Sequence, residues 1–452
     1  MSASRSPSLH RQPIALATIM GVTASHIHQV LAGAPFAPQL EHTPSAVRAA
    51  AQAHGFYVLR QLGWAQAVLA LLVPKRPKKP KLQAHLLHAL VLLEAARQWA
   101  DDPSLAVRRP DIPLYAVHTV VDQAVAAAGR LGLAAFKRLI NAVLRNYLRQ
   151  HETLSQQLQS QPEAVWNYPR WWIEAVQRHY PAQWSTILSQ TQLPAPLTLR
   201  VNIRQTTVAA YLTALEAAGI KAYGAGAQTV VLEQSVPVPQ LPGYDEGWFS
   251  VQDGHAQLAA EYLPLSDGQY VLDACAAPGG KTAHLLEKHD LELVAIDVDA
   301  QRLQRVKEGL RRLRLHTEAV ELLAADAAQP EQWWSGRPFD AILADVPCTA
   351  SGVVRRHPDI RWLRQPQDVK RVVALQKQMV AALWPLLKPG GYLLYVTCSI
   401  FPAEGEEQIQ HFLAQHADVI RLAAPGQLLP TPEQPGQRGG DGFFYALLQK
   451  EG

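Results

Sequence analysis

Cysteine is scarce in this chain of 452 residues, which has only Cys275, Cys348 and Cys398. Three cysteines are too few, and odd in number, for a disulfide framework, so a small fold held together by disulfides is excluded. Long apolar runs are also missing, since none approaches the roughly 20 residues that a membrane-spanning helix needs. The apolar run PIALATIMGV near the N-terminus is short and continues into a helical pattern, which predicts a core helix rather than a signal peptide. We therefore expect a cytoplasmic protein without a membrane partner.

Net charge is also small, at +4, but it is unevenly distributed along the chain. Residues 1–150 contain 17 Lys and Arg against 6 Asp and Glu, whereas the remaining residues contain 25 against 32. A basic N-terminal block predicts an anionic partner, nucleic acid above all, although a solvated basic surface would give the same count. Apolar residues make up 48% of the chain, which is enough for packed cores, and the length predicts about three domains.

The pattern of apolar residues changes twice along the chain. Residues 1–150 are rich in Ala and Leu at helical spacing, which predicts an all-helical domain with an exposed basic loop, KRPKKPK, at 75–81. Residues 151–250 begin with a polar stretch, 151–165, that is either a linker or a poorly buried helix, and continue with strand and helix patterns of a small α/β domain. From 251 to 452, short apolar strands alternate with helices, which predicts a doubly wound parallel sheet.

The stretch DACAAPGGKT, residues 273–282, looks at first like a phosphate-binding loop, but Cys275 stands where such a loop has its first glycine. Four predicted strands end in a carboxylate, at Asp273, Asp297, Asp326 and Asp345. In a doubly wound sheet these ends meet at the ligand-binding edge, where carboxylates would repel a phosphate-rich ligand. S-adenosylmethionine fits better, because it has no phosphate and carries a cationic sulfonium. A nicotinamide site, which lacks its glycine motif here, and a purely structural turn are the alternatives.

Cys348 and Cys398 each follow a predicted strand, so both are expected at that same edge of the sheet. Lone cysteines are usually inert core residues. One reaction beside a methyl donor needs a thiolate, however: cytosine C5 becomes nucleophilic only after a thiolate adds to C6. An acid must also stabilise N3 of the ring, and Asp345 lies three residues before Cys348. These residues predict a catalytic cysteine without deciding which of the two attacks.

Four stretches together resemble the bacterial 16S ribosomal RNA cytosine-5 methyltransferases of the RsmB (Sun) type: DACAAPGGKT, DVPCTASGVVRRHPDIRW, TCSIFPAEGEEQI and DGFFYA. The resemblance covers nearly the whole chain, and LINAVLRNYLR resembles the end of a NusB-like helical domain. It implies a multidomain fold with a NusB-like RNA-binding domain at 1–150, a small α/β domain at 151–250 and a Rossmann-like S-adenosylmethionine-dependent methyltransferase domain at 251–452. The chain departs from the usual pattern at Val346, Thr349 and Gly405.

The resemblance also implies a role for each matching residue. Cys398 matches the nucleophile, and Cys348 matches the cysteine that assists release of the methylated base. Lys281 and Asp345 are implied to face the reacting base. The positions implied to contact the cofactor are Cys275, Ala276, Ala277, Pro278, Gly279, Gly280, Lys281, Asp297, Asp326 and Asp345.

RNA contacts are expected in the stretch VVRRHPDIRWLRQ, because Arg suits phosphates and aromatic rings stack on bases. The candidates are Arg355, Arg356, His357, Arg361 and Trp362, and the alternative is a charged loop that packs Trp362 into the core. The predicted function is methylation of C5 of a specific cytosine in 16S ribosomal RNA by a monomer with S-adenosylmethionine and without a metal. A transfer RNA cytosine-5 methyltransferase and a non-catalytic RNA-binding factor of ribosome assembly are the alternatives.

Overall fold

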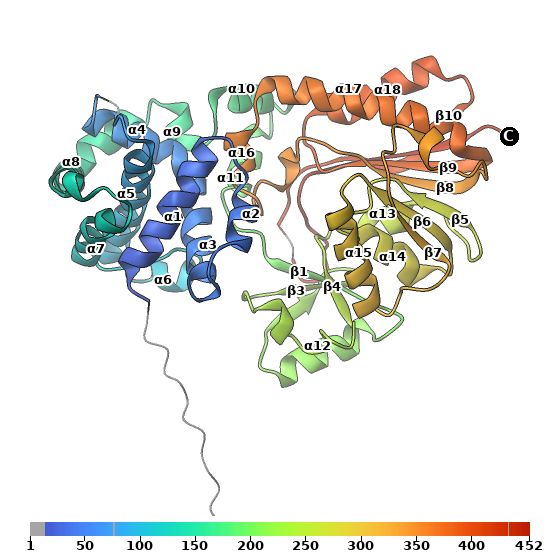
Figure 1. Ribbon diagram of the computed structural model, residues 1–452, viewed down its shortest axis with the longest axis horizontal. Helices are drawn as coiled ribbons and strands as arrows, with labels where there is room; N and C mark the ends of the chain where they lie inside the picture. The colour runs from blue at the N-terminus through green and yellow to red at the C-terminus, as the bar shows by residue number, and fades with distance from the viewer. Residues whose placement is uncertain (1–13, 76, 433) are drawn as a thin grey trace, which may run out of the picture. The chain divides into compact units, whose positions relative to one another are not determined.

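The computed structural model describes residues 14–75, 77–432 and 434–452, which form two compact units. The helical unit comprises the described residues up to Glu174 together with His357–Leu363, and the sheet unit comprises Ala175–Arg356 and Arg364–Gly452 (Figure 1). The expected order of a helical region, a small α/β domain and a Rossmann-like domain is confirmed. Among the described residues, no helix is both long and apolar enough to cross a membrane.

Helix α5 (Pro80–Asp101) lies at the centre of the helical unit, where it contacts α1, α3, α4, α7 and α8 (Figure 1). Buried apolar residues therefore occur on all of its faces. The basic loop predicted at 75–81 separates α4 from α5 and exposes its lysines, while Arg76 lies outside the described residues. The helices of the helical unit are α1 (Leu16–Leu31), α2 (Phe36–Glu41), α3 (Ser45–Arg60), α4 (Leu62–Leu72), α5, α6 (Leu105–Arg108), α7 (Val117–Arg130), α8 (Lys137–Leu158), α9 (Pro162–Trp166), the start of α10 (Arg170–His179), and α16 (Ile360–Leu363).

The polar stretch at 151–165 is helical for most of its length. Helix α8 continues through it to Leu158, and α9 begins at Pro162. Leu154 and Leu158 are buried, so the second half of α8 still presents an apolar stripe to the core of the helical unit. Of the two alternatives left open by the sequence, the helix is the one that forms.

A small antiparallel sheet with strand order β2-β3-β1-β4 follows α11 (Trp184–Gln190) in the sheet unit. Its strands are β1 (Leu197–Val201), β2 (Ala222–Gly224), β3 (Thr229–Leu232) and β4 (Phe249–Val251), with α12 (Val208–Ala217) between the first two. The sequence pattern predicted β1, α12 and β3, but not the three-residue strands β2 and β4. Arg200 of β1 forms a fully buried ion pair with Glu287 of α14 at 2.7 Å and donates to the carbonyl of Gly280 at 2.6 Å. The small sheet is thus tied to the helix that follows the cofactor loop.

The large sheet has seven strands in the order β10-β11-β9-β8-β5-β6-β7. Strands β7, β6, β5, β8 and β9 are parallel, and β11 and β10 are antiparallel to their neighbours. The strand β10 was not predicted. The bounds are β5 (Tyr270–Asp273), β6 (Glu292–Asp297), β7 (Val320–Ala324), β8 (Phe339–Asp345), β9 (Leu387–Thr397), β10 (Val419–Leu428) and β11 (Phe443–Lys450).

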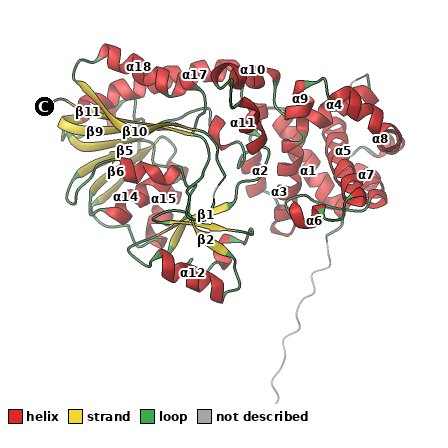
Figure 2. Cartoon of the chain, turned by 180° about the vertical axis from the view of Figure 1, so that it is seen from behind, coloured by secondary structure: helices red, strands yellow, loops and turns green. Residues whose placement is uncertain are grey.

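Helices cover both faces of this sheet, with α14 (Gly280–Lys288) and α15 (Ala300–Arg312) on one face and α17 (Pro366–Leu383) and α18 (Glu406–Gln415) on the other (Figure 2). Successive side chains of a strand point to opposite faces of the sheet, so a separate hydrophobic core forms on each face. Along β5, Val271 packs on the face of α14 and Leu272 on the face of α17. Because both faces are covered, the central residues of β5, β6 and β8 are apolar and buried, as the sequence predicted.

Candidate active site

A cavity of about 430 Å³ opens at the carboxyl ends of the parallel strands of the large sheet. This is the edge at which doubly wound sheets bind their ligands, and the volume lies in the usual range for small-molecule sites. Its lining comes from the loops after β5, β6, β7, β8 and β9 and from α17: Ala274, Cys275, Ala277, Asp297, Val298, Arg302, Ala325, Asp326, Ala327, Asp345, Val346, Pro347, Cys348, Ala350, Leu375, Met379 and Cys398.

The loop between β5 and α14 needs a glycine where it turns into the helix. Gly279 has φ +96°, in the left-handed region, and a Cβ there would lie 3.0 Å from Cγ1 of Val306 on α15. The loop is also fastened to the neighbouring strand, because the N–H of Ala276 donates to the carbonyl of Ile296 at 2.9 Å. These contacts bring the loop backbone close to the end of β6.

Asp297, at the end of β6, holds the loop between β5 and α14 in place. Its carboxylate accepts from the N–H of Ala277 at 3.1 Å and from the N–H of Asp299 at 3.0 Å. Asp299 caps the N-terminus of α15 and thereby orients Arg302, which donates to the carbonyl of Ala277 at 2.7 Å and lies 3.6 Å from Asp297. Arg302 was not predicted from the sequence, although its place one turn after the Asp299 cap was a usable signal.

Lys281 and Asp345 form an ion pair at the base of the cavity. Nζ of Lys281 lies 2.7 Å from Oδ2 of Asp345 and 5.2 Å from the ring centre of Phe443. Burial by itself would lower the pKa of Lys281, but the negative charge of Asp345 outweighs it and raises that pKa. Lys281 is therefore a fixed cation, and Asp345, whose side chain is 28% exposed, lines the cavity.

The sulfurs of Cys348 and Cys398 lie 3.3 Å apart, within the same cavity as Asp297. The two cysteines meet because β8 and β9 are adjacent parallel strands, with Asp345 opposite Val396 in the ladder. The hydrogen bond to the sulfur of Cys398, followed by burial, raises the pKa of Cys348 well above its usual value. Cys348 is accordingly held as a thiol.

Burial disfavours the charged forms of two further groups beside the loop. Burial raises the pKa of Asp273 to about 7, even though Thr282 donates to its carboxylate at 2.7 Å. Burial likewise raises the pKa of Cys275, next to which Asp345, Asp273 and Asp297 add negative charge. A protonated Cys275 is a poor nucleophile.

Of the residues predicted to bind a cofactor, Cys275, Ala277, Asp297, Asp326 and Asp345 line the cavity. The turn and helix start that follow, Pro278 to Lys281, shape the loop without being part of that lining. The sequence analysis missed the apolar walls formed by Val298, Ala327, Leu375 and Met379. Val298 directly follows Asp297, and that position after the strand-end carboxylate was the signal in the sequence. The structure shows that its side chain is 71% exposed.

The arginines predicted to contact RNA are largely used inside the protein, which corrects that expectation. Arg355 is buried and pairs with Asp441 and Asp253, and Arg356 pairs with the same two carboxylates, at 2.6 Å and 2.8 Å. Arg355 thus lacks the exposed guanidinium that a phosphate contact needs.

The remaining three RNA candidates belong to the helical unit. Arg361 is fully buried with its guanidinium 4.2 Å from the ring centre of Tyr168. Trp362 donates to the carbonyl of Leu59 at 2.7 Å and packs against the helical core, as in the alternative that the sequence left open. Only His357 of these three is exposed.

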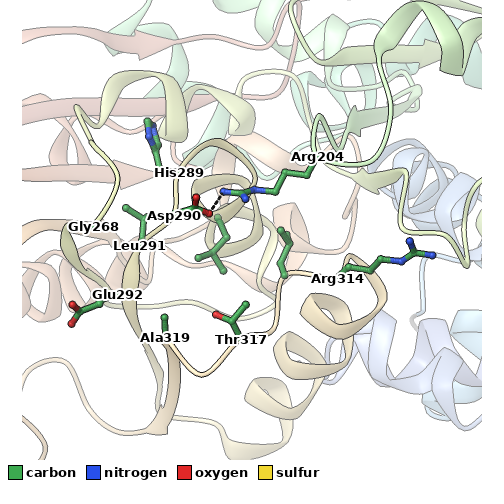
Figure 3. A pocket seen from close by; sticks show the side chains of 11 residues that line it. Arg204, Gly268, His289, Asp290, Leu291, Glu292, Arg314, Thr317 and Ala319 are labelled. Carbon is green, nitrogen blue, oxygen red and sulfur yellow. Dashed lines mark ion pairs between the residues drawn. The ribbon is translucent and has the colours of Figure 1, made fainter.

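A second cavity, of about 290 Å³, lies at the opposite, amino-terminal edge of the large sheet (Figure 3). Gly268, Glu292 and Ala319, which line it, lie just before β5, at the start of β6 and just before β7. Arg204 forms an ion pair with Asp290 there, at 2.7 Å. None of the site residues predicted from the sequence lines this cavity.

Two family models match the chain. The model described as 16S rRNA methyltransferase RsmB/F matches residues 260–449, and the ferredoxin-like domain of RsmF/B-like methyltransferases matches residues 168–239. The residues matched by the first model include the whole lining of the cavity at the carboxyl ends of the strands, and those matched by the second include the strands β1, β2 and β3.

Curated relatives and solved structures are similar over most of the chain. Ribosomal RNA small subunit methyltransferase B of Vibrio cholerae is 44% identical over 338 residues, 74% of this chain and 77% of the relative. The protein of the same name from Pseudomonas syringae is 44% identical over 347 residues, with the same coverage. The crystal structure of PH0851 has a TM-score of 0.74 at 23% identity and covers 96% of this chain and 99% of its own. A methyltransferase homologue from Pyrococcus horikoshii has a TM-score of 0.54 at 26% identity, covering 64% and 97%.

Proposed function

The chain belongs to the RsmB/F family of 16S rRNA methyltransferases, and from this premise we propose that it methylates C5 of one cytosine in 16S ribosomal RNA through a covalent bond between Cys398 and C6. The observation that carries the proposal is the 3.3 Å separation of two cysteine sulfurs in a cavity that also presents Asp297 and Asp345. A methyl-donor site and a candidate nucleophile thus share one cavity.

The residues of the cavity fit S-adenosylmethionine. Three carboxylates, of Asp297, Asp326 and Asp345, suit a ligand that has hydroxyls and a positive charge but no phosphate. The exposed side chain of Val298 and that of Leu375 offer apolar surface for a planar base. When bound, S-adenosylmethionine supplies an electrophilic methyl group on its sulfonium. We assign Asp297 to the ribose hydroxyls and the loop after β5 to the amino-acid end.

The chemistry of the chain itself follows from its thiols and its carboxylate. Cys398, as a thiolate, adds to C6 of the cytosine, while Asp345 stabilises the proton at N3 and so makes C5 nucleophilic. After methylation, a base removes the proton of C5 and the thiolate of Cys398 leaves. Cys348, held as a thiol beside Cys398, is suited to assist this last step rather than the attack, since a thiol is a poor nucleophile. Lys281 keeps Asp345 in place.

The helical unit is assigned a role in binding RNA. Lys75, Lys78, Lys79 and Lys81 are exposed around the loop between α4 and α5, and such charges bind phosphates without reading sequence. Its resemblance to NusB-like domains supports the same role and also leaves protein binding as an alternative.

The test is methyl transfer from labelled S-adenosylmethionine to unmethylated small-subunit RNA, with transfer RNA as the competing substrate. We expect label in 5-methylcytosine at one position of the small-subunit RNA. Label in transfer RNA alone would assign the chain to the second substrate class. No label in either RNA would favour a non-catalytic factor of ribosome assembly.

A further inference from the structure

A buried carboxylate outside the cavity contacts both loops that carry the active-site cysteines. Glu404 ends the short turn Pro402–Glu404, a few residues after Cys398, and its side chain is inaccessible to solvent. One oxygen accepts from the N–H of Thr349 at 2.7 Å. The other accepts from the hydroxyl of Ser399 at 2.7 Å and from the hydroxyl of Thr349 at 2.5 Å.

The two residues bound by Glu404 are the immediate neighbours of the two cysteines. Thr349 follows Cys348, and Ser399 follows Cys398. The loops are also joined directly, because the N–H of Gly352 donates to the carbonyl of Cys398 at 2.9 Å and the hydroxyls of Ser351 and Ser399 lie 2.9 Å apart. Beside these bonds, Glu404 is the group that binds the residue after each cysteine, whose own hydroxyls are 3.4 Å apart. Because each bound residue is one peptide from a sulfur, movement of Glu404 changes the distance between the two sulfurs.

The side-chain amide of Gln376 also donates to Glu404, in a fourth contact at 3.4 Å. All four contacts of the carboxylate are therefore with hydrogen-bond donors. A buried carboxylate is unfavourable unless such bonds compensate for the lost hydration. Burial raises the pKa of Glu404, while the hydrogen bonds from Thr349 and Ser399 oppose that shift. A neutral apolar residue would fill the same space but could not bind both loops.

We propose that Glu404 is a positioning residue that holds the sulfurs of Cys348 and Cys398 at the separation their reaction requires. Its catalytic consequence rests on the proposed function, in which the thiolate of one cysteine must attack and then leave beside the thiol of the other. Glu404 does not line the cavity, and its hydrogen bonds reach the two cysteine loops through Thr349 and Ser399. Its charge also adds to the causes that raise the pKa of Cys348, so it acts on that thiol through the electric field as well.

The experiment compares Glu404→Gln with Glu406→Gln in the full chain. The glutamine has nearly the shape of the glutamate, but its NH2 group replaces one of the two acceptor oxygens. It either faces the N–H of Thr349, which it cannot accept, or faces the hydroxyls of Thr349 and Ser399 and forces them to reorient. Glu406 is the matched control, because it lies two residues further on, is half-exposed, and pairs with Arg421.

The first measurement is the rate at which diamide links Cys348 to Cys398, read by peptide mass spectrometry. The two thiols lose two electrons and two protons to diamide, which becomes the hydrazine, and one S–S bond forms. This rate reports on the placement of the sulfurs and needs neither RNA nor methyl transfer. The second measurement is the single-turnover rate of methyl transfer, together with the affinities for S-adenosylmethionine and RNA.

We expect Glu404→Gln to slow both cross-linking and single-turnover transfer by roughly 10- to 100-fold, since small displacements of reacting groups have effects of this size. Both affinities should stay within about twofold of the wild type, and Glu406→Gln should match the wild type throughout. A folded Glu404→Gln protein with wild-type rates in both measurements would overturn the proposal. If the wild type transfers no methyl group but Glu404→Gln still slows cross-linking, the positioning role stands and the proposed function fails.

A second set of variants serves if Glu404→Gln does not fold. Thr349→Val removes the hydroxyl bond to Glu404, whereas Thr349→Ser keeps it. We expect Thr349→Val to slow cross-linking and Thr349→Ser to restore the wild-type rate. Equal cross-linking rates in these two variants would contradict the role of Glu404.

Discussion

The sheet unit has one cavity at each edge of its large sheet, and the two differ in what lines them. At the carboxyl-terminal edge, Asp297, Asp326 and Asp345 share the lining with sulfurs of three cysteines. At the amino-terminal edge, the charges of Arg204 and Asp290 are paired with each other, and no cysteine is present in the lining (Figure 3). The two cavities thus differ in the chemistry of the groups that line them.

The difference follows from the direction of the strands. Five parallel strands deliver the residues after their last position to one edge, so loops far apart in the sequence converge there. The loops at the other edge only connect helices back to strands. The volume of a cavity therefore does not predict whether it is a functional site, whereas the direction of the strands and the residues of their loops do. Four predictions test this contrast between the edges.

The largest effect is expected from Cys398→Ala. Without the sulfur that adds to C6, single-turnover methyl transfer should fall by a factor on the order of 10⁴ or more. Binding of S-adenosylmethionine, measured by calorimetry, should be unchanged within about twofold, because Asp297 and the loop after β5 remain. Appreciable methyl transfer by this variant would mean that the nucleophile is another residue.

Cys348→Ala should leave the attack intact but impair release of the product. We expect a covalent adduct of protein and RNA that survives a denaturing gel, together with strongly reduced multiple turnover. Peptide mapping should place the RNA on Cys398. If Cys398→Ala instead forms the adduct and Cys348→Ala does not, the roles of the two cysteines are exchanged.

Asp297→Asn tests the carboxyl-terminal edge against the amino-terminal one. Loss of a charged hydrogen-bond acceptor should weaken binding of S-adenosylmethionine roughly 10- to 100-fold, since such bonds contribute about 1.5–3 kcal/mol. Arg204→Met, which removes the ion pair with Asp290 in the other cavity, is the control and should change the affinity by less than about twofold. Equal losses in both variants would remove the functional distinction between the edges.

The last prediction concerns stability rather than activity, and it is a dependence of stability on pH that Asp273 produces. Its pKa is raised to about 7 in the folded protein against 3.8 ordinarily, so the folded state binds more protons between these values. The stabilisation is complete below about pH 4 and is lost as the pH rises through 7. Relative to Asp273→Asn, the unfolding free energy of the wild type should fall with rising pH by up to about 1.4 kcal/mol per pH unit. Urea unfolding at several pH values measures this, and parallel curves for the two proteins would contradict it.

Local patterns in the sequence were sufficient to predict the strands of the Rossmann-like domain and the chemistry at their ends. Asp297 and Asp345 end β6 and β8, as expected for two of the strands predicted between 251 and 452. These predictions succeed because strand formation depends on the alternation and apolar content of a few consecutive residues, and because parallel strands must release their loops at one edge. The convergence of Cys348 and Cys398 at that edge follows from the same reasoning.

Only the tertiary structure decided which polar residues are buried and which residues they contact. Arg355 and Arg361 look like surface cations in the sequence, yet Asp441 and the ring of Tyr168 hold them inside the protein. Glu404 could not be recognised from its neighbours, because its partner Thr349 lies 55 residues earlier. Burial and pairing depend on segments that meet only after folding, so a local pattern contains no information about them. The sequence thus determined where the chemistry would lie, and the packing of distant segments determined which side chains are available for it.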